Sequence, residues 1–350
     1  MTTVSRHTAI HREGSDVAIS SDVVFVGTDA TPFIHMYEWT ENGFGAKYAN
    51  PATLPTGAVR SMSVTPDKRF LVCAVGNDTN RPQLCYRITS DGLVLVNSFI
   101  AANNITRTAA VNKSGTAVAV SNVDGLLTTY RLSRITGLGA QFGGTKNAVS
   151  RQCDFDSNDS RLMFVRETSP YMQIHPYDET SGCGTAFANS ASGVGTTPGR
   201  AARFTADDSY LVLLRFAGSG TTLESYNIIT DAGPGTKVAS GVAIVNGTGV
   251  VISDAAGLVG VSTVGSPYVA VYPYSSGTYG TKLANPANLP TEQGSACAFN
   301  PAGTLFFAVS DDSNVIHAWP ISGSAFGVRY AFPTSLPAGN GASVTFLSMS

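Results

Sequence analysis

Four arginines recur at one matched position along the chain, and their side chains are well suited to binding an anion. They are Arg60, Arg107, Arg151 and Arg200, and each stands four residues before an apolar residue of a repeating unit. Guanidinium groups bind carboxylates and phosphates through paired hydrogen bonds. If these positions begin the inner strands of a ring, the arginines line one mouth of a central channel and receive an anion or an acidic partner loop. Alternatively, they brace neighbouring units by bonding loop carbonyls.

Three histidines suggest metal chemistry at first sight. His35, His175 and His317 each lie two residues before an aromatic residue that ends a strand-like segment. Repeat symmetry would place them in different units, whereas zinc needs ligands at about 2.0 to 2.3 Å from one point. The segment 154–159 opens like a calcium loop but lacks the glycine and the last acidic ligand. We therefore expect no metal site and no cofactor.

Catalytic sequence motifs are missing from the chain. It has no Gly-x-Ser-x-Gly elbow, no phosphate-binding Gly-x-x-x-x-Gly-Lys-Ser/Thr loop and no His-Glu-x-x-His pair. Small and apolar residues dominate the expected inner strands, where Arg203 is a further exception. These observations predict that the protein is not an enzyme.

The elements that must position these residues are repeated. Residues 48–56 (YANPATLPT) return almost unchanged as 283–291 (LANPANLPT). One apolar position recurs every 44 to 49 residues, at Ile19, Val64, Val111, Phe155, Phe204, Ile252, Phe299 and Leu347. A turn, an apolar run, a strand ending on an aromatic residue and a weaker fourth strand follow most of them. Four short strands in such a period are typical of one β-propeller blade.

Seven complete units predict an all-β fold, a seven-bladed β-propeller with four antiparallel strands per blade, and a single domain over residues 1–350. The eighth anchor, near residue 347, has no strands after it, and residues 343–350 align with residues 59–66. We therefore expect both chain ends to share one blade, where the C-terminal strand pairs beside the segment around Ile19 and closes the ring. The sequence does not indicate which of the two strands is innermost.

Composition limits the classes of partner. The net charge is −2 and only 13% of residues are charged, so no basic surface is expected to attract nucleic acid. The N-terminal residues lack the apolar core of a signal peptide, and no apolar run is long enough to span a membrane. We expect synthesis in a cytoplasm and no membrane insertion. The five cysteines include no Cys-x-x-Cys pair, which argues against a disulfide framework or a zinc site.

Residues 31–39, 43–51 and 266–274 carry a Pro-aromatic strand, a Gly-Phe-Gly turn and an Asn-Pro-x-x-Leu-Pro loop. In these segments the chain resembles the WD40-like propeller repeats of bacteriophage virion proteins. The resemblance implies a non-enzymatic structural or attachment component of a phage particle, associated with its tail and located in the virion. Its implied partners are other virion proteins and a host-surface receptor or glycan.

Loops whose length differs between units are the expected places for such binding, because they can vary without harming the core. The candidates are Asn77, Asp78, Asn80, Arg81, Glu167 and Thr168. Two alternatives remain open. One is a seven-bladed lactonase-type enzyme, which requires acidic, arginine and histidine side chains to converge in the channel. The other is a scaffold propeller that docks peptides.

Overall fold

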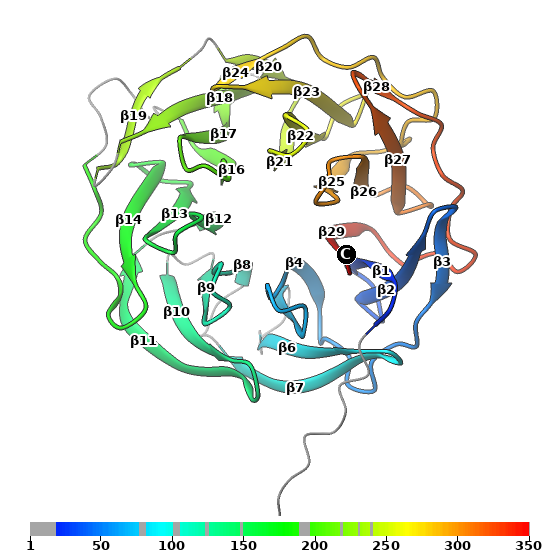
Figure 1. The fold of residues 1–350 in the computed structure, drawn as a ribbon, viewed down its shortest axis with the longest axis horizontal. Helices are drawn as coiled ribbons and strands as arrows, with labels where there is room; N and C mark the ends of the chain where they lie inside the picture. The colour runs from blue at the N-terminus through cyan, green and yellow to red at the C-terminus, as the bar shows by residue number, and fades with distance from the viewer. Residues whose placement is uncertain are drawn as a thin grey trace, which may run out of the picture.

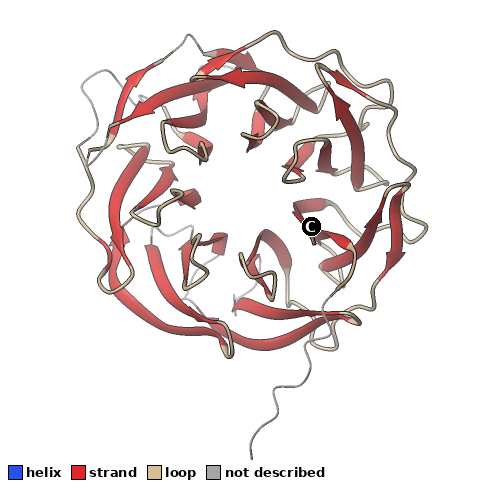
Figure 2. Ribbon diagram, viewed as in Figure 1, coloured by secondary structure: helices blue, strands red, loops and turns tan. Residues whose placement is uncertain are grey.

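The computed structural model describes residues 19–76, 82–100, 106–122, 126–147, 150–188, 197–217, 220–229, 232–238 and 241–349. Seven antiparallel sheets stand radially around one axis and form a disc, and the described residues include strands but no helix (Figure 1, Figure 2). Six sheets have four strands, and one has an additional short strand, β20 (Val242–Ile244), beside its third strand. The predicted seven-bladed propeller is therefore confirmed. Within the described residues, no helix has the length and apolarity needed to cross a membrane.

Seven strands, one from each blade, stand nearest the axis of the disc (Figure 1). They are β4 (Ala58–Val64), β8 (Thr106–Val111), β12 (Ser150–Phe155), β16 (Gly199–Phe204), β21 (Gly247–Ser253), β25 (Gly294–Phe299) and β29 (Gly341–Leu347). Both faces of these strands pack against the innermost strands of the neighbouring blades, and one edge of each strand faces the channel. Buried and half-buried residues therefore mix along them, as in β12.

The second and third strands of each blade form its core. The second strands are β1 (Asp22–Thr28), β5 (Phe70–Gly76), β9 (Ala117–Asn122), β13 (Arg161–Arg166), β17 (Tyr210–Ala217), β22 (Leu258–Thr263) and β26 (Leu305–Ser310). The third strands are β2 (Ile34–Thr40), β6 (Pro82–Thr89), β10 (Leu126–Ser133), β14 (Met172–Asp178), β18 (Gly220–Ile228), β23 (Val269–Ser275) and β27 (Ile316–Ser322). Neighbouring blades cover both faces of the second strands, so all seven residues of β5 are buried. This explains their nearly continuous apolar runs.

The outermost strands are shorter in several blades, and loops return from them to the channel. They are β3 (Gly43–Lys47), β7 (Gly92–Ile100), β11 (Gly137–Asn147), β15 (Gly182–Cys183), β19 (Pro234–Lys237), β24 (Thr278–Tyr279) and β28 (Ala325–Phe326). The repeated Asn-Pro-x-x-Leu-Pro segments are such returning loops. The Tyr86 hydroxyl donates to the carbonyl of Thr53, in the first such loop, at 3.0 Å. The Tyr37 hydroxyl donates at 2.7 Å to the carbonyl of Ser335, in a related loop that keeps only Pro-x-x-Leu-Pro, residues 333–337. This motif therefore holds the crossing from rim to channel in place.

The two ends of the chain share one blade, whose strand order is β29-β1-β2-β3. The C-terminal strand β29 is innermost, which the sequence did not indicate. Two expected details differ from the structure. Ile19 is buried but precedes β1 and belongs to no strand. The anchor position is Phe346 and not Leu347, because Phe346 pairs with Val24, which in turn pairs with the aromatic Tyr37.

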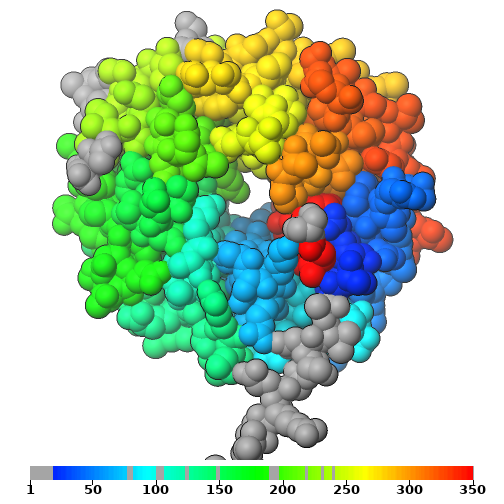
Figure 3. Space-filling view, viewed as in Figure 1, coloured from blue at the N-terminus to red at the C-terminus, as the bar shows by residue number. Residues whose placement is uncertain are grey.

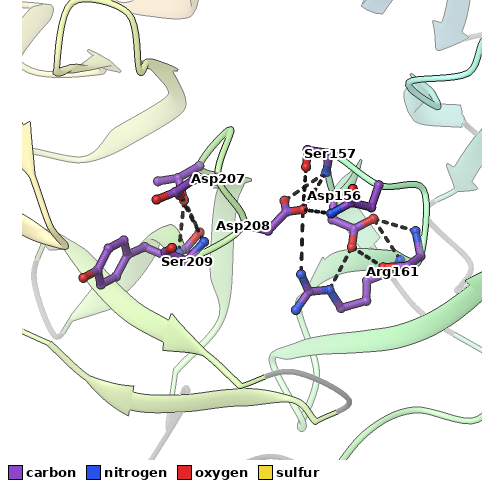
Figure 4. A network of polar contacts seen from close by, with 10 residues as sticks. Asp156, Ser157, Arg161, Asp207, Asp208 and Ser209 are labelled. Carbon is purple, nitrogen blue, oxygen red and sulfur yellow. Dashed lines mark hydrogen bonds and ion pairs between the residues drawn. The ribbon is translucent and has the colours of Figure 1, made fainter.

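Aspartates clamp consecutive blades together on the face that carries the turns after the innermost strands. The Asp159 carboxylate accepts the backbone amides of Lys113 and Ser114, both at 2.7 Å, from the preceding blade. Asp208 accepts the Ser157 amide at 2.9 Å and the Ser157 hydroxyl at 2.6 Å in the same way (Figure 4). These charge-assisted bonds fix the angle between neighbouring blades and so help to set the geometry of the channel.

Candidate binding site in the central channel

Each innermost strand contains a β-bulge near its first residues, and the arginines occupy it. The register of β12 on β13 shifts between Ser150 and Gln152, which leaves Arg151 as the additional residue. The same shift leaves Arg60, Arg107 and Arg200 outside the regular pairing of their strands. A bulge bends its strand and redirects a side chain. In the other three blades the bulge residues are Thr248, Ser295 and Ala342.

The bulge residues of all seven blades line one cavity of about 160 Å³ at one end of the channel. We call the four arginines among them, Arg60, Arg107, Arg151 and Arg200, the arginine mouth. A second cavity of about 700 Å³, here called the chamber, reaches the face that carries the interblade aspartate clamps. Both cavities are lined by Ser61, Met62, Thr108 and Arg203, so they are two parts of one channel. Figure 3 shows the opening at the centre of the disc.

Glu167 contributes a carboxylate to the arginine mouth. It lies on the loop from β13 to β14, and its Oε1 atom is 2.7 Å from Arg107 Nη1 and 2.8 Å from Arg151 Nη2. The two arginines come from adjacent blades, so this single oxygen bridges an interblade boundary. Thus Glu167, predicted as a binding-loop residue, and two arginines predicted at the channel mouth form one cluster. The exposed fraction of the Glu167 side chain is 31%, so solvent and ligands can reach it.

Arg107, Arg151 and Arg200 together carry more positive charge than Glu167 neutralises. Burial lowers the pKa of Arg151 from its ordinary value, Glu167 raises it, and the charges of Arg107 and Arg200 lower it further. Burial also lowers the pKa of Arg200. The Nε–H groups of Arg151 and Arg200 are buried and have no hydrogen-bond partner among the described residues. Such an arrangement favours an additional anion.

The opposite side of the same mouth is different in chemistry. The Thr248 hydroxyl donates to the Gly294 carbonyl at 2.7 Å, and the Ser295 hydroxyl lies 3.2 Å from an oxygen of Asp311. The Ser343 hydroxyl donates to the Val59 carbonyl at 2.7 Å. These hydroxyls hold neighbouring elements together, so the positive charge is confined to the four consecutive blades that carry arginines.

The chamber contains a carboxylate and a guanidinium that the sequence did not assign together. Asp154 and Arg203 both line it, and each stands one residue before the anchor of its blade. Their strands, β12 and β16, are neighbours. Among the described residues, the Asp154 side chain takes part in no hydrogen bond or ion pair. Their shared position before the anchor was the sequence signal that could have paired these two residues.

Asp154 lies three positions after Arg151 along β12, which corresponds to about 10 Å of strand. A ligand could therefore place an anionic group at the arginine mouth while its other end reaches the chamber. Two thiols also line the channel, Cys153 and Cys297. Burial raises the pKa of each to about 12, so both stay protonated at neutral pH and do not provide a thiolate nucleophile.

The remaining predicted site residues fall outside this cluster. Thr168 is exposed, and its hydroxyl lies 3.5 Å from a guanidinium nitrogen of Arg166. Asn77, Asp78, Asn80 and Arg81 lie outside the described residues. Their segment joins β5 to β6, which is the same type of connection as the loop that carries Glu167.

The histidines are buried within blades and do not line the two channel cavities. His35, His175 and His317 expose 2%, 4% and 1% of their surface. His35 and His317 share one repeat position, as predicted, but His175 does not. His175 pairs with Leu162, which pairs with the anchor Phe155, whereas His317 pairs with Ala308, two residues away from its anchor level. Among the described residues, no group of three or more His, Cys, Asp or Glu side chains could hold a metal ion.

One buried group has the composition of a catalytic triad but not its geometry. Ser310 Oγ lies 3.0 Å from His317 Nε2, and Asp312 Oδ2 lies 3.2 Å from the same nitrogen. A triad needs the serine and the acid on opposite ring nitrogens. Burial raises the pKa of Asp312, but hydrogen bonds from His317 and the Thr291 amide outweigh it and hold this pKa well below its usual value. The group therefore stabilises its blade.

A second buried charge cluster lies in the blade of β18. The Glu224 carboxylate is 2.5 Å from Arg215 Nε and 2.6 Å from Lys237 Nζ, and it also accepts the Tyr226 hydroxyl at 2.7 Å. Burial raises the pKa of Glu224, but these hydrogen bonds outweigh burial and bring it to about 2. Because every partner belongs to the same blade, this cluster serves the stability of the blade.

No protein-family model matches the chain, and no curated protein matches it in sequence. Solved structures match it in fold over nearly its whole length. A Bacteroides fragilis protein assigned as a 6-phosphogluconolactonase shares 13% identity at a TM-score of 0.75, covering 94% of this chain and 98% of its own. A Bacteroides uniformis protein with the same assignment shares 14% identity at a TM-score of 0.70, covering 93% and 99%. The periplasmic gluconolactonase of Pseudomonas aeruginosa shares 15% identity at a TM-score of 0.72, covering 95% and 100%.

These findings correct the functional prediction. The chain was expected to be a non-enzymatic structural or attachment component of a bacteriophage particle, but these matching propellers are named as lactone hydrolases. Nothing in the comparisons links the chain to a virion. The prediction failed because the motifs that carried the resemblance have a structural role: the Asn-Pro-x-x-Leu-Pro loop and its related version hold the chain where it crosses from one blade to the next. At this level of identity the likeness itself shows the shared propeller fold.

Proposed function

We propose that the protein binds a small anionic sugar-derived lactone in its central channel and hydrolyses the lactone ring. The observation that carries this proposal is the excess of guanidinium groups at one end of the channel, next to a chamber that contains Asp154 and Arg203. The names of proteins with the same fold support it, since they describe hydrolases of the lactones of phosphorylated and unphosphorylated gluconic acid.

In this proposal the arginine mouth holds the anionic group of the substrate. A phosphate can accept hydrogen bonds from more than one guanidinium at once, and Arg107 and Arg151 already share one oxygen of Glu167. The Arg200 guanidinium, which lines the same cavity, offers further donors. Binding at the mouth would direct the ring of the substrate along the channel toward the chamber.

Hydrolysis needs a base for water and a positive group for the developing oxyanion. The Asp154 carboxylate would take a proton from water as the water oxygen attacks the lactone carbonyl carbon. The electron pair of the carbonyl moves onto its oxygen, which faces the Arg203 guanidinium. When the tetrahedral intermediate collapses, the bond to the ring oxygen breaks, and that oxygen takes the proton from Asp154. One water is added, and the product is an open-chain hydroxy acid.

Steady-state hydrolysis of 6-phosphogluconolactone and of gluconolactone tests this proposal, with the spontaneous rate subtracted. Asp154→Asn should lower kcat by roughly 100-fold or more, the range expected for loss of a general base. Asp91→Asn is the matched control, because Asp91 is exposed in the turn between β6 and β7. Turnover that does not exceed the spontaneous rate would refute the hydrolysis, and an unchanged kcat for Asp154→Asn would remove Asp154 from the mechanism.

A further inference from the structure

Glu167 occupies part of the site in which an external anion would bind. Its Oε1 atom accepts from Arg107 and from Arg151, at 2.7 and 2.8 Å. A carboxylate in this position makes the contacts that one oxygen of a bound phosphate or carboxylate would make. It comes from the loop after β13, whereas the arginines come from β8 and β12. The loop therefore places a negative group across the boundary between two blades.

We propose that Glu167 is a built-in competitor that makes the arginine mouth selective for ligands with two negative charges over ligands with one. This inference rests on the proposed anion site and deepens it, but it does not depend on catalysis. A ligand that enters the mouth replaces Glu167 on Arg107 and Arg151, and the released carboxylate returns to water.

The exchange has a different outcome for the two classes of ligand. A monoanionic carboxylate replaces an identical group, so it gains little from the two arginines and also loses its own freedom of motion. A phosphate dianion brings a second charge and more acceptor oxygens, which can reach the Arg200 guanidinium in the same cavity. Only the dianion gains interaction energy in the exchange, so selectivity follows from the presence of Glu167.

The exposure of the cluster sets the size of the effect. The side chains of Glu167, Arg107 and Arg151 expose 31%, 31% and 26% of their surface, so solvent screens both ion pairs. Partly exposed pairs of this kind are weak, and removing two of them should change ligand affinity by roughly tenfold. A positioning role for Glu167 predicts the opposite sign, because arginines that lose their support would bind phosphate less tightly.

The test is isothermal titration calorimetry of the full-length protein with inorganic phosphate and with acetate, at pH 8 and low ionic strength. Glu167→Gln keeps the size of the side chain and removes its charge. We expect this variant to bind phosphate roughly tenfold more tightly than the wild type and to gain measurable binding of acetate. Thr168→Val, on the same loop, is the control and should leave both affinities unchanged.

Thermal unfolding gives a second measurement on the same proteins. Without phosphate, Glu167→Gln should unfold at a lower temperature than the wild type, because the arginines lose their counter-ion. Adding phosphate should raise its Tm by more than it raises that of the wild type. Unchanged or weaker phosphate binding by Glu167→Gln would overturn the competitor role.

Absence of phosphate binding in both proteins would overturn the anion site together with this inference. Tighter phosphate binding by Glu167→Gln, in a protein that does not hydrolyse lactones, would support the inference and refute only the proposed hydrolysis. The two proposals can therefore fail separately.

Discussion

Replacing Arg151 with methionine should weaken the binding of 6-phosphogluconate, the hydrolysis product of the proposed phosphorylated substrate. Methionine keeps much of the aliphatic stem and removes the guanidinium, including the contact at 2.8 Å to Glu167. A unit charge pair at 4 Å is worth about 4 kcal/mol at an effective dielectric constant of 20. Exposure of 26% of the Arg151 side chain and screening by salt reduce this value. A hydrogen bond to a charged group contributes roughly 1.5 to 3 kcal/mol, so we expect a 10- to 150-fold increase in Kd.

Calorimetric titration at two salt concentrations measures this loss. The matched control is Arg134→Met, because Arg134 lies away from the channel, has a 66% exposed side chain and comes only within 4.0 Å of Asp67. The control should leave Kd unchanged, and Arg151→Met should also reduce the dependence of affinity on salt. Equal affinity of Arg151→Met and the wild type, or equal losses in both variants, would refute the reasoning that the arginine mouth binds the anion.

Four further predictions concern stability. Burial, reinforced by the charge of Lys47, lowers the pKa of His35 to about 3, so the unfolded protein binds more protons than the folded one at acidic pH. The free energy of unfolding should therefore fall as pH drops from about 6.5 to 3. Urea titrations at pH 7 and pH 4 should show a smaller decrease in His35→Phe than in the wild type. Glu224→Gln should lower the free energy of unfolding by roughly 3 kcal/mol at pH 7, because the pKa of the folded carboxylate is about 2. The difference from the wild type should shrink as pH falls from about 4.5 toward 2. Equal acid sensitivity of both proteins in urea titrations would contradict this. Asp208→Asn should lower stability by about 2 kcal/mol in thermal melts, since the amide loses charge-assisted bonds to the preceding blade. Deletion of residues 341–349 should expose the edge of β1 and cause aggregation, visible by light scattering, whereas a monomeric product with the wild-type Tm would refute the closing role of β29.

The fold was predictable from the sequence because period and burial are directly linked. Apolar runs mark second strands covered on both faces, and seven of them require seven blades. Errors arose where adjacent positions have similar chemistry. Phe346 and Leu347 are both apolar, so the closing strand could be shifted by one residue without a visible cost. His175 was misaligned because the aromatic Tyr177 in its strand lies two residues beyond the level of Trp319.

The candidate site was only partly predictable. The spacing of the arginines indicated a shared level, but the bulges that take them out of the regular pairing are visible only in the structure. Glu167 was chosen for loop variability, and its contact with Arg107 and Arg151 depends on a loop conformation that no sequence pattern specifies. Asp154 was considered only within the segment 154–159, which opens like a calcium loop but lacks two of its required residues, so no function was assigned to its carboxylate.

A crystal structure of the complex with 6-phosphogluconate would show directly whether the anion binds in the channel. We expect the phosphate within hydrogen-bond distance of Arg107 and Arg151, with Glu167 displaced and the carboxylate end of the ligand next to Asp154 and Arg203. Ligand bound on the outer surface, or a channel that stays without ligand at saturating concentration, would contradict this expectation.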